Sequence, residues 1–170
     1  GGPTIINMMI GGFPNTLFGK PGRDEEIAKV KQSIHAAAKV GLPVIEYNFY
    51  AHRIVEGYYE ELGRGGAGMT AFGFDRIKDL PPLPDIGAWT LDQMWANITY
   101  FLKAVVPEAE KAGVHLAQHP NDPPAPISRG SQQIMSTLAG WKKLVDIVKS
   151  PYNGITFDCG VTRELGEDPV

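Results

Sequence analysis

Apolar strand-like segments alternate with amphipathic helical segments along this chain, and this alternation constrains its fold more than any other feature. The helical segments repeat apolar residues about every 3.6 positions, whereas the strand-like runs are short and bounded by turn residues. The order is strand 4–10, helix 24–41, strand 43–49, helix 90–113, strand 114–119, helix 137–148 and strand 154–159. It predicts an α/β fold with about four parallel strands and three helices, joined by right-handed crossovers. Four strands do not close a barrel.

The segment from Tyr50 to Trp89 shows neither the helical repeat nor a strand-like apolar run, and it is rich in Gly and Pro. A loop of this length in a compact domain is usually an active-site lid or a binding loop, so we expect 50–89 to be a long active-site loop. The glycines at 63–68 lie inside this loop and not at a strand-to-helix turn. That position disfavours a dinucleotide-binding sheet.

The boundaries of the helix at 90–113 are marked by specific residues. Thr90 and Gln93 fit a capping box, in which each side chain bonds the backbone of the other residue. Pro107 is expected to kink or restart the helix, because it lacks a backbone N–H and crowds the preceding turn. Gly113 is expected to end it.

Composition excludes several classes of partner. A net charge of −3, without a basic run, offers no field that would attract nucleic acid or an anionic membrane. No apolar run reaches the roughly 20 residues that span a bilayer. The first residues lack the basic start of a signal peptide, and a lone Cys forms no internal disulfide. These features predict a cytoplasmic protein that binds neither nucleic acid nor membrane, and they leave open whether it forms a homo-oligomer.

Polar residues follow three successive predicted strands at the point where each one ends. Asn48 ends the second strand, His119 the third and Cys159 the fourth. The carboxyl ends of barrel strands converge on the active site, so these side chains are expected to meet there. Imidazole and thiolate suit a borderline divalent metal, although two ligands are too few to hold a catalytic ion. The alternatives are a buried apolar Cys159 and a turn histidine at His119 that bonds the backbone.

Three further residues are candidates for substrate contact. Arg53 follows the second strand and could bind a carboxylate through two parallel hydrogen bonds. The alternative is a surface arginine in a mobile loop. Asn121 and Asp122 lie in a Pro-rich loop that presents them rigidly. They would bind substrate hydroxyls or steady the His119 ring, and the alternative for Asn121 is a local turn.

Several segments resemble the mannonate dehydratase family, in the right order and spacing over about 42–49 and 90–160. The most specific is His119-Pro120-Asn121-Asp122-Pro123-Pro124, and the strand Asn153-Gly154-Ile155-Thr156-Phe157-Asp158-Cys159 adds to it. The resemblance implies a xylose-isomerase-like TIM barrel, so the chain is expected to be a single incomplete domain over 1–170, a partial (β/α)8 barrel.

The same resemblance implies dehydration of D-mannonate to 2-keto-3-deoxy-D-gluconate with Mn²⁺ or Fe²⁺. Carried over to this chain, two of the family's metal ligands are His119 and Cys159. The later His and Asp ligands have no counterpart in this sequence, and the acid/base residues are expected mostly downstream of it, so the chain alone is expected to be inactive. The alternatives are a sugar isomerase or epimerase on the same barrel, and a barrel piece without catalysis.

The sequence departs from the family pattern in three places. The family usually has Asp at the position of Asn121, and Thr-Gly-Ser or similar residues where this chain has Gly160-Val161-Thr162. The loop from Tyr50 to Trp89 does not match. These departures bear on the substrate more than on the fold.

Overall fold

A four-stranded parallel sheet forms the centre of the computed structural model, which describes residues 7–170. Its strand order is β1-β2-β5-β8, and the strands are β1 (Asn7–Ile10), β2 (Val44–Tyr47), β5 (His115–Gln118) and β8 (Asn153–Ile155). All three pairings are parallel, as predicted. Residues 4–6 of the first predicted strand lie outside the described residues.

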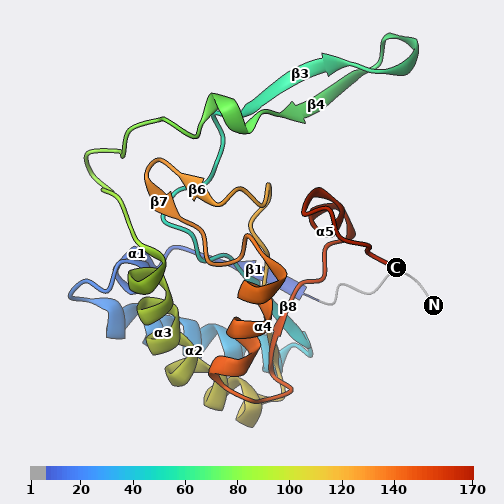
Figure 1. The fold of residues 1–170 in the computed structure, drawn as a ribbon. Helices are drawn as coiled ribbons and strands as arrows, with labels where there is room; N and C mark the ends of the chain where they lie inside the picture. Colours follow the sequence, from blue (N-terminus) through green and yellow to red (C-terminus); the bar gives the residue numbers. More distant parts are fainter. Residues whose placement is uncertain (1–6) are drawn as a thin grey trace.

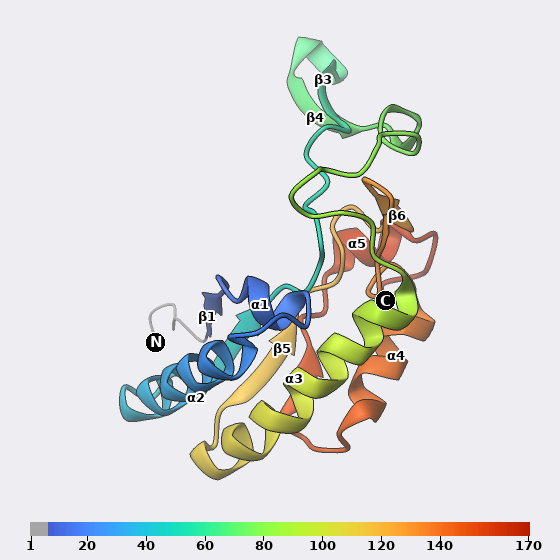
Figure 2. The ribbon, with the colours of Figure 1, turned by 90° about the vertical axis from the view of Figure 1, so that its left-hand side faces the viewer.

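Three long helices cover one face of this sheet, as Figure 2 shows: α2 (Arg23–Lys39), α3 (Leu91–Ala112) and α4 (Leu138–Ile147). Ile34 of α2, Phe101 of α3 and Leu144 of α4 are fully buried. They share one apolar core with Ile45 and Leu116 of the sheet. Burial of the apolar face of each helix fixes the helices on the sheet. The carboxyl ends of the strands stay uncovered and can carry a functional site.

The capping box predicted for α3 is present. The Thr90 hydroxyl accepts from the backbone N–H of Gln93, and the Gln93 side chain accepts from the backbone N–H of Thr90. The helix runs through Pro107 to Ala112 and ends at Gly113, whose φ of 69° is left-handed. The restart expected at Pro107 therefore does not occur. Pro107 lies on the exposed side of the helix, where water can satisfy the carbonyl that loses its partner.

The segment 50–89 contains secondary structure that the sequence reading missed. A two-stranded antiparallel hairpin, β3 (Tyr58–Leu62) and β4 (Gly68–Phe72), projects away from the sheet (Figure 1). Its tip is the 3-10 turn η1 (Arg64–Gly66), and a second turn, η2 (Phe74–Arg76), follows β4. Gly65 and Gly66 have φ of 71° and 78°, so the glycines that suggested a loop make the tight end of a hairpin.

Three small elements lie in the loops of the fold. Helix α1 (Pro14–Leu17) lies in the loop after β1, where Glu26 of α2 accepts backbone N–H groups of Asn15 and Thr16. Strands β6 (Ile127–Ser128) and β7 (Ser131–Gln132) form a short hairpin after the Pro-rich loop. In residues 7–170 no helix is both long and apolar enough to span a bilayer.

The fourth predicted strand is shorter than expected. Strand β8 ends at Ile155, and helix α5 (Cys159–Glu164) begins four residues later. The cause is Asp158, whose side chain accepts the backbone N–H of Val161 at 2.9 Å and caps the helix. Cys159 is therefore the first residue of a helix and not the last residue of a strand.

Candidate active site

A cavity of about 240 Å³ opens beyond the carboxyl ends of β1, β2 and β5. Its lining contains Met9, Asn48, Tyr50, Arg53, Ile54, His119, Pro120, Asn121, Asp122 and Gln133. The four residues predicted to contact substrate and the predicted ligand His119 thus share one cavity, although they come from distant parts of the sequence. Cys159 is not among the lining residues.

His119 is placed by the strand that precedes it. Its backbone N–H donates to the carbonyl of Tyr47 at 2.9 Å, which extends the pairing of β5 with β2 by one residue. Its ring Nδ1 lies 2.8 Å from the carbonyl oxygen of Pro120. A carbonyl oxygen only accepts hydrogen bonds, so Nδ1 carries a proton and Nε2 of the neutral ring is left with its lone pair.

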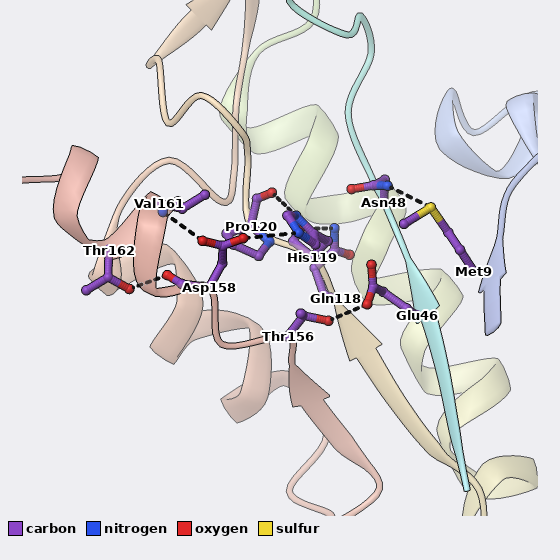
Figure 3. A network of polar contacts seen from close by, with 10 residues as sticks. All are labelled: Met9, Glu46, Asn48, Gln118, His119, Pro120, Thr156, Asp158, Val161 and Thr162. Atoms are coloured by element: carbon purple, nitrogen blue, oxygen red, sulfur yellow. Dashed lines mark hydrogen bonds and ion pairs between the residues drawn. The ribbon is translucent and has the colours of Figure 1, made fainter. Parts of the chain in front are cut away.

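Asp158 faces that nitrogen, and the sequence reading missed it. Its Oδ2 lies 3.7 Å from His119 Nε2, while its Oδ1 holds the N-terminus of α5 (Figure 3). The backbone carbonyl of Asp158 also accepts the hydroxyl of Thr162 at 2.7 Å. A signal was present in the sequence, because Asp before a short helical stretch is a typical N-cap.

The side chain of Cys159 is exposed at the start of α5. The alternative of a buried apolar cysteine is therefore wrong. In the part of the chain that the structure describes, no three His, Cys, Asp or Glu side chains converge as a metal site would require. At the strand ends, His119 Nε2 and Asp158 Oδ2 lie 3.7 Å apart, and imidazole with carboxylate is a suitable donor set for Mn²⁺ or Fe²⁺.

Asn121 lines the cavity but is buried and held at both ends of its carboxamide. Its Nδ2 donates to Gln133 Oε1 at 2.7 Å, and its Oδ1 accepts the backbone N–H of Met135 at 2.8 Å. Gln133 in turn donates to the carbonyl of Ala125 at 2.9 Å. These bonds join the Pro-rich loop to the segment before α4, so Asn121 fixes the wall of the cavity.

The other predicted contact residues are more accessible. Arg53 and Asp122 are exposed, and Asn48 is half-buried. The Asn48 side chain donates to the sulfur of Met9 at 3.7 Å, which ties the end of β2 to β1. Arg53 and Asp122 therefore keep their charges available to a ligand.

A cluster of polar residues anchors the start of the 50–89 segment next to Arg53. His52 Nδ1 lies 2.8 Å from Ser128 Oγ, and its Nε2 lies 3.5 Å from Glu56 Oε1. Arg129 also contacts Glu56 Oε1, from Nη2 at 2.7 Å and from Nε at 2.8 Å. The segment 52–56 is thus bound to the β6–β7 hairpin, which limits the movement of Arg53 at the cavity.

Buried and exposed carboxylates give this end of the sheet a negative character. Burial raises the pKa of Glu164 in α5, and the charges of Asp122 and Asp158 raise it further. On β2, the buried Glu46 accepts the hydroxyl of Thr156 at 3.1 Å (Figure 3). Such surroundings favour a bound cation.

Comparison with known proteins agrees with this geometry. The family model for D-mannonate dehydratase (UxuA) matches residues 84–168, half of the chain. The chain belongs to the mannonate dehydratase family. The matched mannonate dehydratase segment includes α3, β5, the Pro-rich loop, α4 and β8, and therefore His119 and Asp158.

Curated relatives extend the match beyond that segment. Mannonate dehydratase of Streptococcus equi subsp. zooepidemicus is 33% identical over 168 residues, covering 84% of this chain and 45% of the relative. That of Thermotoga petrophila is 31% identical over 183 residues, covering 89% of this chain and 50% of the relative. The chain thus spans about half the length of the curated mannonate dehydratases it matches.

A solved structure supports the same assignment. The crystal structure of mannonate dehydratase from Streptococcus suis serotype 2 superimposes with a TM-score of 0.80 at 29% sequence identity. The match covers 90% of this chain and 47% of that chain. The expected family and its α/β arrangement are therefore confirmed.

Proposed function

We propose that this chain serves the metal-dependent dehydration of D-mannonate to 2-keto-3-deoxy-D-gluconate and water. The observation that carries the proposal is the convergence of His119, Arg53, Asn48 and Asp122 on one cavity at the strand ends. Membership of the mannonate dehydratase family supports the choice of substrate.

The residues around the cavity suit a polyhydroxy acid. The Arg53 guanidinium can form two parallel hydrogen bonds to the carboxylate of the sugar acid. The side chains of Asn48 and Asp122 can form hydrogen bonds with hydroxyl groups of the substrate. The hydrogen bonds of Asn121 to Gln133 and Met135 hold the loop that carries Asp122. A divalent cation, Mn²⁺ or Fe²⁺, would supply Lewis-acid stabilisation of the charge that develops when the C2 proton leaves.

His119 is the residue that we assign to this cation. Because the Pro120 carbonyl holds the proton on Nδ1, the lone pair of Nε2 can coordinate the cation without a change of tautomer. Among residues 7–170 no group of three or more His, Cys, Asp or Glu side chains could hold a metal ion, so we expect no turnover by the 170-residue chain alone. We assign the proposed activity to the protein encoded by the complete reading frame, since the 170-residue chain spans about half the length of its curated relatives.

The test is product identification with that complete product. It is incubated with D-mannonate and Mn²⁺, and the mixture is analysed for a 2-keto-3-deoxy acid by mass spectrometry and NMR. Loss of one water with a new C3 methylene is the expected result. An isomeric product of unchanged mass would instead indicate a sugar isomerase or epimerase. Unchanged substrate under full metal loading would indicate a barrel protein without this chemistry.

A further inference from the structure

We propose that the cavity at the strand ends continues into a second, apolar lobe that binds part of the substrate. The substrate class that fits both lobes is a sugar acid with an apolar group, aryl or acyl, at the end remote from its carboxylate. The inference rests on the proposed function for the orientation of the sugar acid and deepens it, since D-mannonate would fill the first lobe only. Its basis is a hollow of about 530 Å³ beside the first cavity.

The two lobes share a border. Met9, Asn48 and Tyr50 line both of them. The Asn48 side chain donates to the Met9 sulfur at 3.7 Å, so this border is held between β1 and the end of β2 (Figure 3). Arg53 lines the first lobe but not the second. A sugar acid whose carboxylate is bound by Arg53 can therefore extend its far end across the border.

Apolar residues and glycines line the second lobe beyond the border. They belong to the end of β1, the loop after it and helix α1, and they are Ile10, Gly11, Gly12, Phe13, Pro14 and Leu17. Ile10 and Leu17 are half-buried and keep part of their apolar surface accessible. Burial of apolar ligand surface against them contributes about 25 cal/mol per Å² removed from water. The first lobe, with Arg53, His119 and Asp122, suits the carboxylate and the hydroxyls instead.

The lining of the second lobe discriminates between kinds of substituent. In the described part of the chain none of its lining residues is charged, so a second carboxylate would be desolvated there without a cation to pair it. A second sugar ring would bury several hydroxyls, and the polar side chains available to them are Asn48 and Tyr50 at the border. An aryl or acyl group presents mostly apolar surface and avoids both costs.

The wall of the second lobe is formed before any ligand binds. The Glu26 carboxylate accepts the backbone N–H of Thr16 at 2.7 Å and the hydroxyl of Thr16 at 3.0 Å. Asn97 of α3 donates to the carbonyl of Leu17 at 2.9 Å, and Phe13 is buried in the main core. These contacts hold helix α1 against α2 and α3, so binding does not have to order this wall.

Two glycines keep the second lobe open. A Cβ at Gly11 or at Gly12 would meet no other atom within 4 Å. Gly12 has a φ of 79° and depends on the conformational freedom of glycine, whereas Gly11 is not among the glycines with positive φ. Gly11→Leu would therefore place a side chain in this open space without backbone strain, and it offers a way to fill the lobe.

Ligand titrations followed by NMR of the ¹⁵N-labelled 170-residue chain test the second lobe without any need for turnover. The two probes are D-mannonate and its 6-O-benzyl ether, which differ only in an aryl group at the end remote from the carboxylate. We expect both to shift the amide signals of residues 48–53, and the benzyl ether alone to shift those of residues 11, 12 and 17. The benzyl ether should bind about tenfold or more tightly, because it buries additional apolar surface.

Gly11→Leu should remove the preference for the benzyl ether. Gly68→Leu is the matched control, because Gly68 also lacks a positive φ and has open space around it, but it lies on the β3–β4 hairpin. This control should keep the preference. The same spectra show whether each variant is folded, and the shifts mapped on the wild-type chain decide the question if Gly11→Leu is not.

Calorimetric titration of the metal-free protein encoded by the complete reading frame should show the same preference for the benzyl ether. Equal affinity for the two probes there would mean that another part of that protein covers the lobe, which overturns the proposal. It is also overturned if the benzyl ether leaves residues 11, 12 and 17 unshifted, or if Gly68→Leu loses the preference as Gly11→Leu does. Failure of the proposed dehydration would leave these binding results unchanged and would be seen only in the product assay.

Discussion

Asn121 donates a hydrogen bond of 2.7 Å to Gln133, and this buried contact fixes the loop that follows His119. The two residues lie on segments that the sequence separates by the whole β6–β7 hairpin. The contact is buried and both side chains have further partners, so these hydrogen bonds cross-link the two segments that form this wall of the cavity.

Replacing Asn121 by Asp should therefore destabilise the protein. The carboxylate still accepts the backbone N–H of Met135, but it places a second acceptor against Gln133 Oε1. Leaving a buried polar group unpaired costs about 1–3 kcal/mol, so the free energy of unfolding in urea should fall by that amount. The exposed neighbour Asp122→Asn is the control and should change stability little. Equal stability of Asn121→Asp and wild type would show that Gln133 has another way to pair.

The Glu56 cluster predicts a specific pH dependence of stability. Burial acts to raise the pKa of Glu56, but hydrogen bonds from a backbone N–H and from Arg129, with the charges of His52 and Arg129, hold it below the usual value. A lowered pKa in the folded state means that the ionised carboxylate stabilises the fold above about pH 4.3, and that this contribution is lost as the pH falls through the lowered value.

Glu56→Gln should accordingly be less stable than wild type at pH 7, and the difference should shrink on acidification. Thermal unfolding at a series of pH values from 7 downward measures it. Glu60→Gln, on the exposed hairpin, should show no such trend. A constant difference across the series would mean that Glu56 acts through packing and not through charge.

Gly140 is required by a close backbone approach. A Cβ at this position would lie 2.1 Å from the carbonyl oxygen of Ile134, which is backbone and has little freedom to move. Gly140→Ala should therefore destabilise the fold by about 1–3 kcal/mol, as overpacking generally does. Ala139→Ser, at an exposed position of the same helix, is the comparison in chemical denaturation. Wild-type stability of Gly140→Ala would imply that the segment before α4 adjusts freely.

Arg53 is expected to affect substrate binding and not folding. Its side chain is exposed and lines the cavity. In the product of the complete reading frame, Arg53→Lys should raise KM for D-mannonate several-fold, because an ammonium cannot reproduce the paired hydrogen bonds of a guanidinium. The melting temperature should stay the same. An unchanged KM would place the substrate carboxylate elsewhere.

Sequence reasoning predicted the sheet and most of the cavity because short apolar runs bounded by turn residues are followed by polar residues such as Asn48 and His119. It extended the last strand to Cys159 because Ile155 to Cys159 continues an apolar pattern, although pairing in β8 ends at Ile155 and Asp158 starts a helix. The contact between Glu56 and Arg129 had no local signal, since loops far apart in sequence form it. Side-chain pairs of this kind depend on tertiary packing, which periodicity does not encode.

His119 is central to the account, and its replacement by Ala in the product of the complete reading frame is the most direct test. Bound Mn²⁺ per chain is measured beside turnover of D-mannonate, with the melting temperature of the metal-free protein as the measure of folding. We predict that both metal content and turnover fall to background while the metal-free protein still unfolds cooperatively. Full metal occupancy with wild-type turnover in His119→Ala would contradict the assignment of this cavity as the metal-dependent active site.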